Sequence, residues 1–237
     1  MALSPAPAGP APLSVIVPVR DEAGGLPLLL ADLGRAPALV REVLVVDGGS
    51  RDRTPLLARL GGARTLFAAG GRGPQLACGA ARAAAPWLLL LHGDVRLPAA
   101  WPEAVAAALA QGEGTAWAFG LRIDARSAAL RLVELAVGLR SRWRSLPYGD
   151  QGLLVPRRLL ESVGGVPRLP LMEDLELVMR LRARARIRRL EGVVRVDARR
   201  WRRLGVWRTA IANARLRQAW RRGVPAAELA ARYYGTD

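Results

Sequence analysis

The sequence of 237 residues lacks lysine altogether, so all 36 of its basic residues are arginines. A Schiff-base lysine, a lysine general base and the lysine of a phosphate-binding P-loop are therefore excluded. The single cysteine, Cys78, excludes an intrachain disulfide and a cysteine zinc site, which fits a reducing compartment. The single histidine, His92, leaves little room for a histidine metal cluster, and a Ser-His-Asp triad would need that one residue.

Long apolar runs are also absent from the chain. Residues 1–19 contain no charged side chain, but their prolines, from Pro5 to Pro18, interrupt any helix, and no basic start precedes them. The longest uncharged run after residue 22 covers only 83–93, whereas a membrane-spanning helix needs ~20 residues. We therefore expect a cytoplasmic protein whose residues 1–12 form a loose Pro/Ala-rich tail.

Positive charge is in excess and is unevenly distributed. The formal net charge is +16 at pH 7. Residues 1–118 contain 10 arginines and 9 acidic residues, whereas residues 119–237 contain 26 arginines and 11 acidic residues. Abundant Arg, Ala, Gly and Pro are typical of GC-rich coding, which accounts for part of this excess without a function. The asymmetry favours an anionic partner for the second half: a phosphorylated substrate, an acidic membrane surface or nucleic acid.

Short apolar runs alternate with helical patterns from Leu13 onward. Thr54 is expected to cap the helix that Pro55 opens. Continuously apolar strands separated by helices are typical of a parallel sheet covered on both faces, so the fold class is α/β. We expect strands at 14–19, 42–46, 63–68, 87–91, 116–123, 153–155 and 193–197, and helices at 25–36, 55–60, 74–85, 99–111, 126–144, 156–163, 173–184 and 206–221.

An aspartate follows three of the expected strands, as Asp21, Asp47 and Asp94. Ligands of parallel α/β sheets bind beyond the carboxyl ends of the strands. A single aspartate in such a loop is usually a turn former or a helix cap. One in each of three loops predicts a binding site at this edge of the sheet.

Four motifs occur in order along the chain: SVIVPVRDE at 14–22, EVLVVDGGSRDRT at 42–54, LHGDV at 91–95 and MED at 172–174. Together they resemble family 2 glycosyltransferases, which are inverting enzymes of the GT-A fold. The resemblance implies a Rossmann-like, mostly parallel central sheet flanked by helices, over residues 13–201. Residues 202–237 would then form a basic helical C-terminal extension. It also implies a nucleotide-diphosphate-sugar donor, Mg²⁺ or Mn²⁺, and a hydroxyl acceptor that is a small molecule or a lipid.

Two further segments are similar to a bacterial subgroup of that family. They are Gly71-Arg72-Gly73 with Gln75, and the loop Tyr148-Gly149-Asp150-Gln151. Members of this subgroup are often encoded beside radical-SAM proteins and are linked to arsenosugar synthesis. This resemblance suggests one subgroup within the family, but it does not identify the molecule that accepts the sugar.

For the donor, the resemblance implies that Glu22 and Asp47 hold the nucleoside, with UDP favoured. Carboxylates suit this role because they accept hydrogen bonds from a base N–H or from ribose hydroxyls. Gly48 and Gly49 allow the backbone to approach the nucleotide closely, although Gly49 could equally be only a turn residue. The guanidinium of Arg72 would contact the diphosphate unless it is simply a solvated arginine. The full donor-binding set is Pro18, Arg20, Glu22, Asp47, Gly49, Arg72, Gln75 and Gly93.

For the metal and the chemistry, the resemblance implies that Asp94 holds the divalent cation. The usual motif is Asp-x-Asp, and this chain has His92-Gly93-Asp94, so the role of His92 stays open between a phosphate contact and a strand cap. Asp174 would be the base that deprotonates the acceptor hydroxyl, while helix capping is its structural alternative. The acceptor-side set is Asp150, Glu173, Arg200 and Trp201. No Gln-x-x element precedes Arg200-Trp201, so polymer synthesis is not inferred.

Two functions without catalysis compete with the enzyme. The basic second half could bind nucleic acid, but the chain has no recognised nucleic-acid motif. A nucleic-acid function would also leave the acidic residues at the strand ends unexplained. Residues 203–222 could form a basic amphipathic helix at an anionic membrane surface, or simply pack against the core. A catalytic domain is compatible with such a peripheral helix at the inner face of a membrane, whereas we expect no specific nucleic-acid partner.

Overall fold

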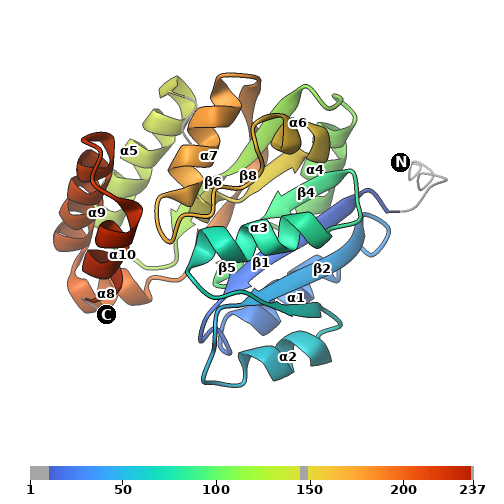
Figure 1. The fold of residues 1–237 in the computed structure, drawn as a ribbon, viewed down its shortest axis with the longest axis horizontal. Coiled ribbons are helices and arrows are strands. Elements are labelled where there is room, and N and C mark those ends of the chain that lie inside the picture. Colours follow the sequence, from blue (N-terminus) through green and yellow to red (C-terminus); the bar gives the residue numbers. More distant parts are fainter. Residues whose placement is uncertain (1–10, 145–148, 236–237) are drawn as a thin grey trace.

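The computed structural model describes residues 11–144 and 149–235, so most of the predicted tail and Tyr148 lie outside the described residues. In this part of the chain the strands form one eight-stranded sheet in the order β3-β2-β1-β4-β7-β6-β8-β5 (Figure 1). The strands are β1 (Leu13–Val19), β2 (Val40–Asp47), β3 (Arg64–Phe67), β4 (Trp87–Leu90), β5 (Val95–Arg96), β6 (Thr115–Ile123), β7 (Leu153–Pro156) and β8 (Arg186–Val196). The helices are α1 (Leu26–Leu33), α2 (Thr54–Leu60), α3 (Arg72–Arg82), α4 (Trp101–Leu109), α5 (Ala128–Arg144), α6 (Arg157–Ser162), α7 (Glu173–Arg182), α8 (Arg199–Leu204), α9 (Val206–Arg221) and α10 (Ala226–Tyr234), with a 3₁₀ turn, η1, at Gly149–Gln151.

The sheet is mixed, and its parallel part is the part that the sequence predicts most directly. Strand β1 pairs in parallel with β2 and with β4, and β2 pairs in parallel with β3. Strand β7 is antiparallel to both β4 and β6, whereas β6 and β8 are parallel. The α/β prediction is confirmed, with β7 and the short β5 as the antiparallel strands.

Both faces of β1 are buried, which explains its unbroken apolar sequence. Val15 and Val17 belong to a core cluster that also contains Leu26 of α1 and Trp101 of α4. Ile16 points into a second cluster on the opposite face, with residues of α3, α6 and α7. Figure 1 views the molecule from the side of α3 and α7. The β1 strand is therefore the centre of the molecule and lies between two parallel neighbours, of which β2 alone pairs with its carboxyl end.

Several element boundaries differ from the prediction. Strand β8 begins at Arg186 and not at 193. Its first residues were not predicted because exposed arginines interrupt the apolar residues and hide the strand pattern. Helix α8 was missed because its six residues, RRWRRL, contain no apolar stripe. Strand β5 has only two residues and was not predicted, and α10 lies within the helical extension expected at 202–237 without having been predicted as a separate helix.

The predicted cap of α2 is also wrong. Thr54 is the first residue of the helix instead of its cap. Oδ1 of Asp52 accepts a hydrogen bond from the Thr54 N–H at 2.9 Å. The Thr54 hydroxyl oxygen instead accepts one from the backbone N–H of Glu22 at 2.8 Å. Thr54 thus ties the loop after β2 to the loop after β1.

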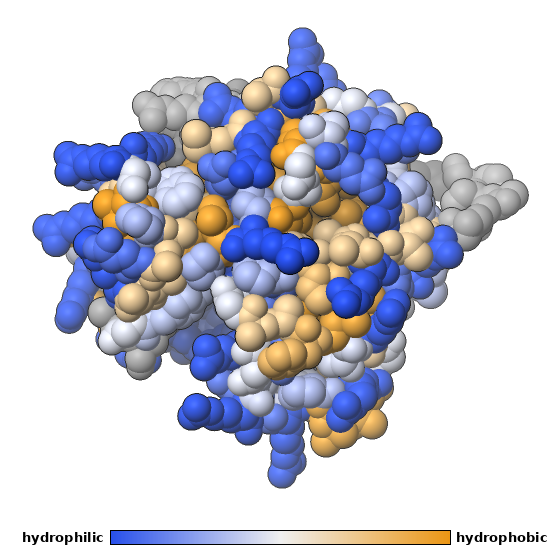
Figure 2. Space-filling model, viewed as in Figure 1, coloured by the Kyte–Doolittle hydropathy of each residue, from blue (hydrophilic) through white to orange (hydrophobic). Residues whose placement is uncertain are grey.

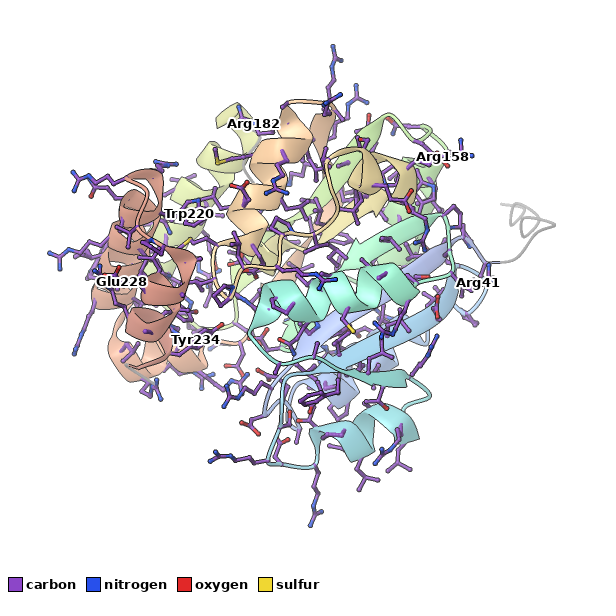
Figure 3. All side chains as sticks on the ribbon, viewed as in Figure 1. Arg41, Arg158, Arg182, Trp220, Glu228 and Tyr234 are labelled. Atoms are coloured by element: carbon purple, nitrogen blue, oxygen red, sulfur yellow. The ribbon has the colours of Figure 1, made fainter. Side chains whose placement is uncertain are left out.

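Helices α8, α9 and α10 gather at one end of the molecule (Figure 1). Leu229 of α10 packs with Met172 and Leu175 in a third core cluster, and Leu216 and Trp220 of α9 lie against it. Trp220 is on the side of α9 that faces α7 (Figure 3). The part of α9 that contains Leu216 and Trp220 therefore packs against the core. Helix α8, at Arg199–Leu204, runs across the domain boundary expected at residue 201.

None of the described helices combines the length and apolarity that crossing a membrane requires.

The close packing of α3 against the segment before α7 generates the first prediction. A Cβ atom on Gly73 would lie 2.3 Å from the Leu169 carbonyl oxygen and 2.5 Å from that of Pro167, both of which are backbone atoms. We expect Gly73→Ala to destabilise the protein by about 1–3 kcal/mol, the usual effect of overpacking. Thermal denaturation measures the change.

Gly138 in α5 provides a matched control, because nothing lies within 4 Å of the Cβ atom that would be added there. Gly138→Ala should stabilise its helix by up to ~1 kcal/mol. Equal melting temperatures for Gly73→Ala and the wild type would contradict the close approach of α3.

Candidate active site

The loops after β1, β2 and β4 lie side by side because β1 is placed between β2 and β4. A Cβ atom on Gly25 would lie 3.1 Å from both the Asp94 Cα and the Gly93 carbonyl oxygen. A Cβ atom on Gly93 would lie 2.9 Å from a methyl group of Val19. Glycines at these two positions therefore let the loop after β1 approach the loop that carries Asp94.

Asp21, one of the three predicted strand-end aspartates, has a structural role. Its φ of 56° places it in the left-handed region. Its Oδ1 accepts a hydrogen bond from the Arg51 N–H at 2.7 Å, and its own N–H donates to the Ser50 hydroxyl at 2.9 Å. Asp21 is thus the turn former that joins the first two loops.

Asp47 is buried at the end of β2 and shapes the loop that follows. Its carboxylate accepts hydrogen bonds from the Gly49 N–H at 3.0 Å and from the Ser50 N–H at 3.1 Å. Gly49 adopts a φ of 94°, which favours glycine. Two carboxylate oxygens offer about four acceptor sites, so these contacts are compatible with nucleoside binding, which stays a prediction.

Gln75 holds the ends of two strands together. It is buried, and its side-chain nitrogen donates to the Val19 carbonyl at 2.9 Å and to the Val46 carbonyl at 2.7 Å. Pro18 is buried within β1 opposite Val46. In the structure Gln75 positions the edge at which the donor is expected, whereas Arg20 lies exposed just beyond β1.

Arg199, which was not predicted as a site residue, lies between carboxylates from three loops. Its Nη2 is 2.6 Å from Glu22 Oε2 and 3.9 Å from Asp94 Oδ2. Its Nε is 3.3 Å from Asp197 Oδ2, and its backbone N–H donates to Asp197 Oδ1 at 2.6 Å. Asp197 follows β8, so the rule that selected the other strand-end aspartates also applies to it. Arg199 directly follows that loop in the sequence.

Burial raises the pKa of Glu22 and of Asp94 above their ordinary values. Arg199 acts in the opposite direction on both groups by stabilising the charged carboxylate. Neighbouring negative charge adds to the burial effect: Asp94 raises the pKa of Glu22, and Asp197 raises that of both. At both carboxylates the effect of burial therefore outweighs the stabilisation of the charged form by Arg199.

A second ion pair joins the first turns of α3 and α7. Arg72 Nε lies 3.0 Å from Glu173 Oε1, and the Glu173 side chain is 1% exposed. Burial raises the pKa of Glu173 to about 7, against the lowering effect of Arg72 and with the raising effect of Asp174. A guanidinium has five N–H donors, so this pairing is compatible with the diphosphate contact predicted for Arg72.

Backbone strain precedes the predicted base. Met172 has a φ of 66°, and it is one of two non-glycine residues at positive φ in the described part of the chain, with Asp21. A left-handed conformation costs about 1–2 kcal/mol in residues other than glycine, asparagine and aspartate. Such strain occurs at functional sites when the surrounding structure imposes it. The turn at Met172 fixes where Glu173 and Asp174 start α7.

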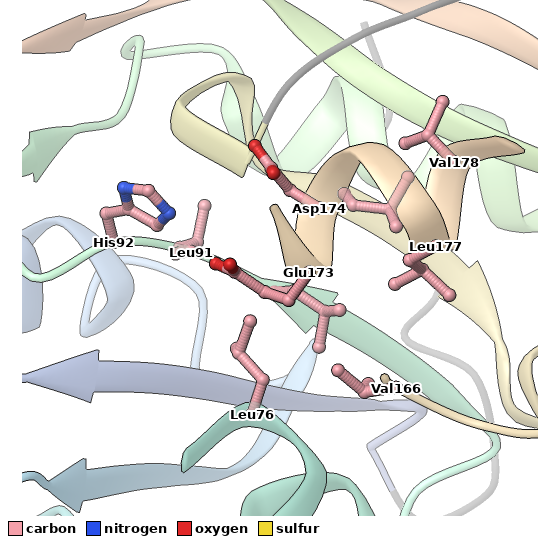
Figure 4. A pocket seen from close by; sticks show the side chains of 10 residues that line it. Leu76, Leu91, His92, Val166, Glu173, Asp174, Leu177 and Val178 are labelled. Carbon is pink, nitrogen blue, oxygen red and sulfur yellow. The ribbon is translucent and has the colours of Figure 1, made fainter. Parts of the chain in front are cut away.

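Glu173 and Asp174 border a small apolar cavity of ≈ 20 Å³. In Figure 4 the carboxylate of Glu173 is directed toward His92, whereas that of Asp174 lies on the other side of the helix start. The lining residues are Leu76, Leu90, Leu91, His92, Leu153, Val166, Glu173, Asp174, Leu177 and Val178. This volume is about that of one water molecule, so the cavity is not a substrate pocket.

His92 is held in its neutral form. Burial lowers its pKa to about 3, with a further lowering by Arg72 and an opposing effect of Asp174. A neutral imidazole has one donor and one acceptor nitrogen, so His92 can form a hydrogen bond without adding charge. It borders both the small cavity and a larger one, which gives it a place in the site but no assigned role.

The larger cavity, of ≈ 240 Å³, joins the strand-end loops to the C-terminal helices. It brings together the predicted Asp94, Asp150, Asp174, Arg200 and Trp201, while Glu173 borders the small cavity instead. Its far wall was not predicted from the sequence and is formed by Thr209, Asn213, Leu216 and Arg217 of α9 and Tyr233 of α10. These residues carry no motif and reach the site only through tertiary packing. Arg200 is placed by stacking, with its guanidinium carbon 3.7 Å from the centre of the Tyr233 ring.

The sequence profile of the family described as "Glycosyl transferase family 2" matches residues 14–158, which is more than half of the chain. The chain belongs to glycosyl transferase family 2. No curated protein sequence matches it.

Solved structures share the fold of this family 2 enzyme at low sequence identity. A mycobacterial protein has 23% identity and a TM-score of 0.56 over 78% of this chain and 65% of its own, so the chain spans less than two thirds of that protein. Glucosyl-3-phosphoglycerate synthase from Mycobacterium tuberculosis, with Mn²⁺, UDP and phosphoglyceric acid, has 22% identity and a TM-score of 0.61 over 90% and 79%. S. aureus TarS has 18% identity and a TM-score of 0.62 over 78% and 36%. The expected GT-A fold is confirmed.

The family match divides the site of this glycosyltransferase into two parts. It includes Glu22, Asp47, Asp94 and Asp150, and it ends before α7. The positions of Asp174 and of the α8 residues in the site are therefore derived from the structure.

The raised pKa of Glu173 generates the second prediction. The folded protein holds the Glu173 proton up to about pH 7, whereas the ordinary pKa is 4.5. Ionisation therefore opposes folding increasingly as the pH rises through this range, and the stability present below 4.5 is lost above 7. Glu173→Gln does not ionise. Calorimetry should show that the melting temperature of the wild type falls relative to that of Glu173→Gln between about pH 5 and pH 8.

Glu176→Gln is the control on the same helix, because Glu176 forms an ion pair with Arg180 one turn later. Its melting temperature should follow that of the wild type across this pH range. A constant difference between wild type and Glu173→Gln would contradict the raised pKa.

Proposed function

We propose that the protein transfers a sugar with inversion from a nucleotide-diphosphate donor, with UDP favoured, to a hydroxyl acceptor. The observation that carries this proposal is that Asp94 and Asp174 line the same cavity of ≈ 240 Å³. A carboxylate suited to the metal and donor side thus shares one space with a carboxylate suited to be the base. The structure of the mycobacterial synthase contains UDP and Mn²⁺, which supports this donor class.

On the donor side, Glu22 and Asp47 would accept hydrogen bonds from the nucleoside at the ends of β1 and β2. Gly49 would leave room for the nucleotide, Gly93 would let the loop after β1 lie close to the donor-side loop of Asp94, and Gln75 would hold both strand ends in place. Pro18 and Arg20 belong to the same edge, and Arg72 would contact the diphosphate. The narrower resemblance to the arsenosugar-linked subgroup is part of this proposal. It rests on Gly71-Arg72-Gly73 with Gln75 and on Tyr148-Gly149-Asp150-Gln151.

The residues fit a divalent cation by the chemistry of their donors. Glu22, Asp94 and Asp197 present carboxylate oxygens around one guanidinium, and Mg²⁺ and Mn²⁺ prefer such hard ligands. Within residues 11–144 and 149–235, no three His, Cys, Asp or Glu side chains are grouped closely enough to hold a metal alone. Asp94 would therefore share the cation with oxygens of the diphosphate. A bound cation would neutralise the charge that develops on the leaving diphosphate.

On the acceptor side, Asp174 would take the proton of the attacking hydroxyl. Inversion requires one base on the face opposite the leaving group, with a single in-line displacement. Oδ1 of Asp174 accepts a hydrogen bond from the Leu175 N–H at 2.7 Å, which orients the carboxylate at the start of α7. Asp150, Arg200 and Trp201 would contact the acceptor within the same cavity. The contact of Glu173 with Arg72 would link this turn to the start of α3.

Association with an anionic membrane surface is a second candidate, which could accompany the first. Trp207 and Ile211 of α9 are 57% and 50% exposed, and arginines alternate with them along the helix. Hydrophilic side chains otherwise project from all edges of the face shown in Figure 2 and do not form one patch there. This distribution gives no support to a nucleic-acid groove on that face.

The third prediction concerns Asp94. If Asp94 holds the cation, Asp94→Asn should weaken UDP binding at least about tenfold in the presence of Mn²⁺, which corresponds to 1.4 kcal/mol. In EDTA, the variant and the wild type should bind UDP equally. Isothermal titration calorimetry measures both conditions, and Asp124→Asn, at an exposed position after β6, controls for the loss of one negative charge. Equal UDP affinity of the wild type in Mn²⁺ and in EDTA would refute the metal role.

The fourth prediction concerns Asp174. Asp174→Asn keeps the capping oxygen but cannot take a proton, so turnover should fall roughly 10²–10⁴-fold. UDP affinity and melting temperature should stay near those of the wild type. A panel of nucleotide-diphosphate sugars, with phosphoglycerate among the trial acceptors, first identifies the donor that supports turnover. Release of the nucleoside diphosphate from that donor then measures the rate.

Glu176→Gln on the same helix is the control for Asp174→Asn and should keep the wild-type rate. If Asp174→Asn also transfers sugar at that rate, the base is another residue, with Glu173 and Asp150 next in line. Unfolding of the variant would instead show that the carboxylate is mainly a structural cap.

A further inference from the structure

Arg199 is the one cation that contacts carboxylates from the loops after β1, β4 and β8 in the ion pairs of the described residues. We propose that Arg199 makes the site select a divalent cation complexed with the nucleotide diphosphate and reject the free cation. This inference rests on the proposed function, because it concerns the cation that the donor requires there.

The geometry anchors Arg199 on two sides and leaves the third side for Asp94. Asp197 holds both the backbone N–H, at 2.6 Å, and the Nε, at 3.3 Å. Glu22 holds Nη2 at 2.6 Å, whereas the distance from the same nitrogen to Asp94 is 3.9 Å. The guanidinium therefore stands close to the predicted metal ligand without forming a short hydrogen bond to it.

This position is unfavourable for a free cation. A divalent ion at Asp94 would meet the charge of Arg199 within a few ångströms, and the repulsion is only partly screened in a half-buried site. The described side chains also include no preformed group of three ligands to offset that repulsion. A cation arriving alone thus has Asp94 as its principal carboxylate beside a positive neighbour, because Glu22 and Asp197 are already paired with Arg199.

A cation that arrives with a diphosphate avoids both difficulties. The phosphate oxygens complete its coordination, and they also offer anionic partners to the guanidinium. The Arg199 side chain is 52% exposed, so it has room to turn from Glu22 toward a phosphate. Arg199 accordingly couples the binding of the cation to that of the nucleotide.

The experiment titrates the protein with Mn²⁺, with and without saturating UDP, and follows free Mn²⁺ by electron paramagnetic resonance. Wild type should bind Mn²⁺ weakly alone and much more tightly with UDP. Arg199→Gln should bind Mn²⁺ alone about tenfold or more tightly than wild type, because the repulsion is removed. The factor by which UDP improves Mn²⁺ binding should shrink accordingly, and by linkage the factor by which Mn²⁺ improves UDP binding should shrink equally.

Three further variants isolate the charge as the cause. Arg199→Met keeps the apolar stem and should reproduce the effect of Arg199→Gln on Mn²⁺ binding. If the glutamine variant fails to fold, the methionine variant takes its place in the test. Arg199→Lys keeps the charge and should stay near wild type. Arg208→Gln removes the same charge from an exposed position on α9 and should leave Mn²⁺ binding unchanged.

Unchanged or weaker binding of Mn²⁺ alone by Arg199→Gln and Arg199→Met would overturn the inference. So would an Arg199→Lys protein that binds Mn²⁺ alone as tightly as the neutral variants do. If no protein in the series, wild type included, binds Mn²⁺ in the presence of UDP, the metal-dependent function itself fails and this inference with it.

Discussion

The burial of several carboxylates at one end of the sheet is the constraint on which this site depends. Glu22, Asp94 and Glu173 have side chains that are 18%, 28% and 1% exposed, and burial raises the pKa of each. Charged groups in such positions need oppositely charged partners, because their removal from water is strongly unfavourable. The chain supplies these partners as two arginines, Arg72 from α3 and Arg199 from α8.

These two arginines act over different ranges. Arg199 contacts its carboxylates directly, from a position 177 residues beyond Glu22 in the sequence. Arg72 pairs with Glu173 but also lowers the pKa of Asp94 and of His92 through its charge. Arg72 therefore connects the metal-side loop to the start of α7 electrostatically. A substitution at either arginine would change the ionisation of groups beyond its direct contacts.

The sequence predicted the part of the molecule in which local pattern and topology agree. Three parallel strands, each followed by a loop with an aspartate, were sufficient to place Asp21, Asp47 and Asp94 at one edge, and the family resemblance added Glu22. The same reasoning could not separate Asp21, which joins two loops, from Asp47 and Asp94, because all three occupy equivalent positions in the sequence. Only the hydrogen bonds of Asp21 to the loop after β2 distinguish it.

Helices α5, α7 and α9 of the second half were predicted from the sequence, but its arginines obscure the pattern of other elements. Strand β8 and helix α8 carry arginine where a strand or helix normally alternates polar and apolar residues in a regular period. The family resemblance placed Arg200 and Trp201 at the site, whereas no pattern pointed to Arg199, although all three follow the same strand. The residues of α9 and α10 that line the larger cavity could not be predicted at all, since only tertiary packing brings them there.

The chain uses arginine and no lysine, and the contacts of two arginines at the site explain part of the positive charge in this half. Arg199 contacts Glu22 through one nitrogen and Asp197 through another, which a planar guanidinium can do and a compact ammonium group cannot. Arg200 stacks on the ring of Tyr233, a contact that also suits a flat, weakly hydrated cation. Replacing Arg200 by lysine would keep the charge but lose the flat stacking contact with Tyr233. The excess of arginine in the second half is therefore partly structural at the site itself, and need not be assigned in full to a nucleic acid or a membrane.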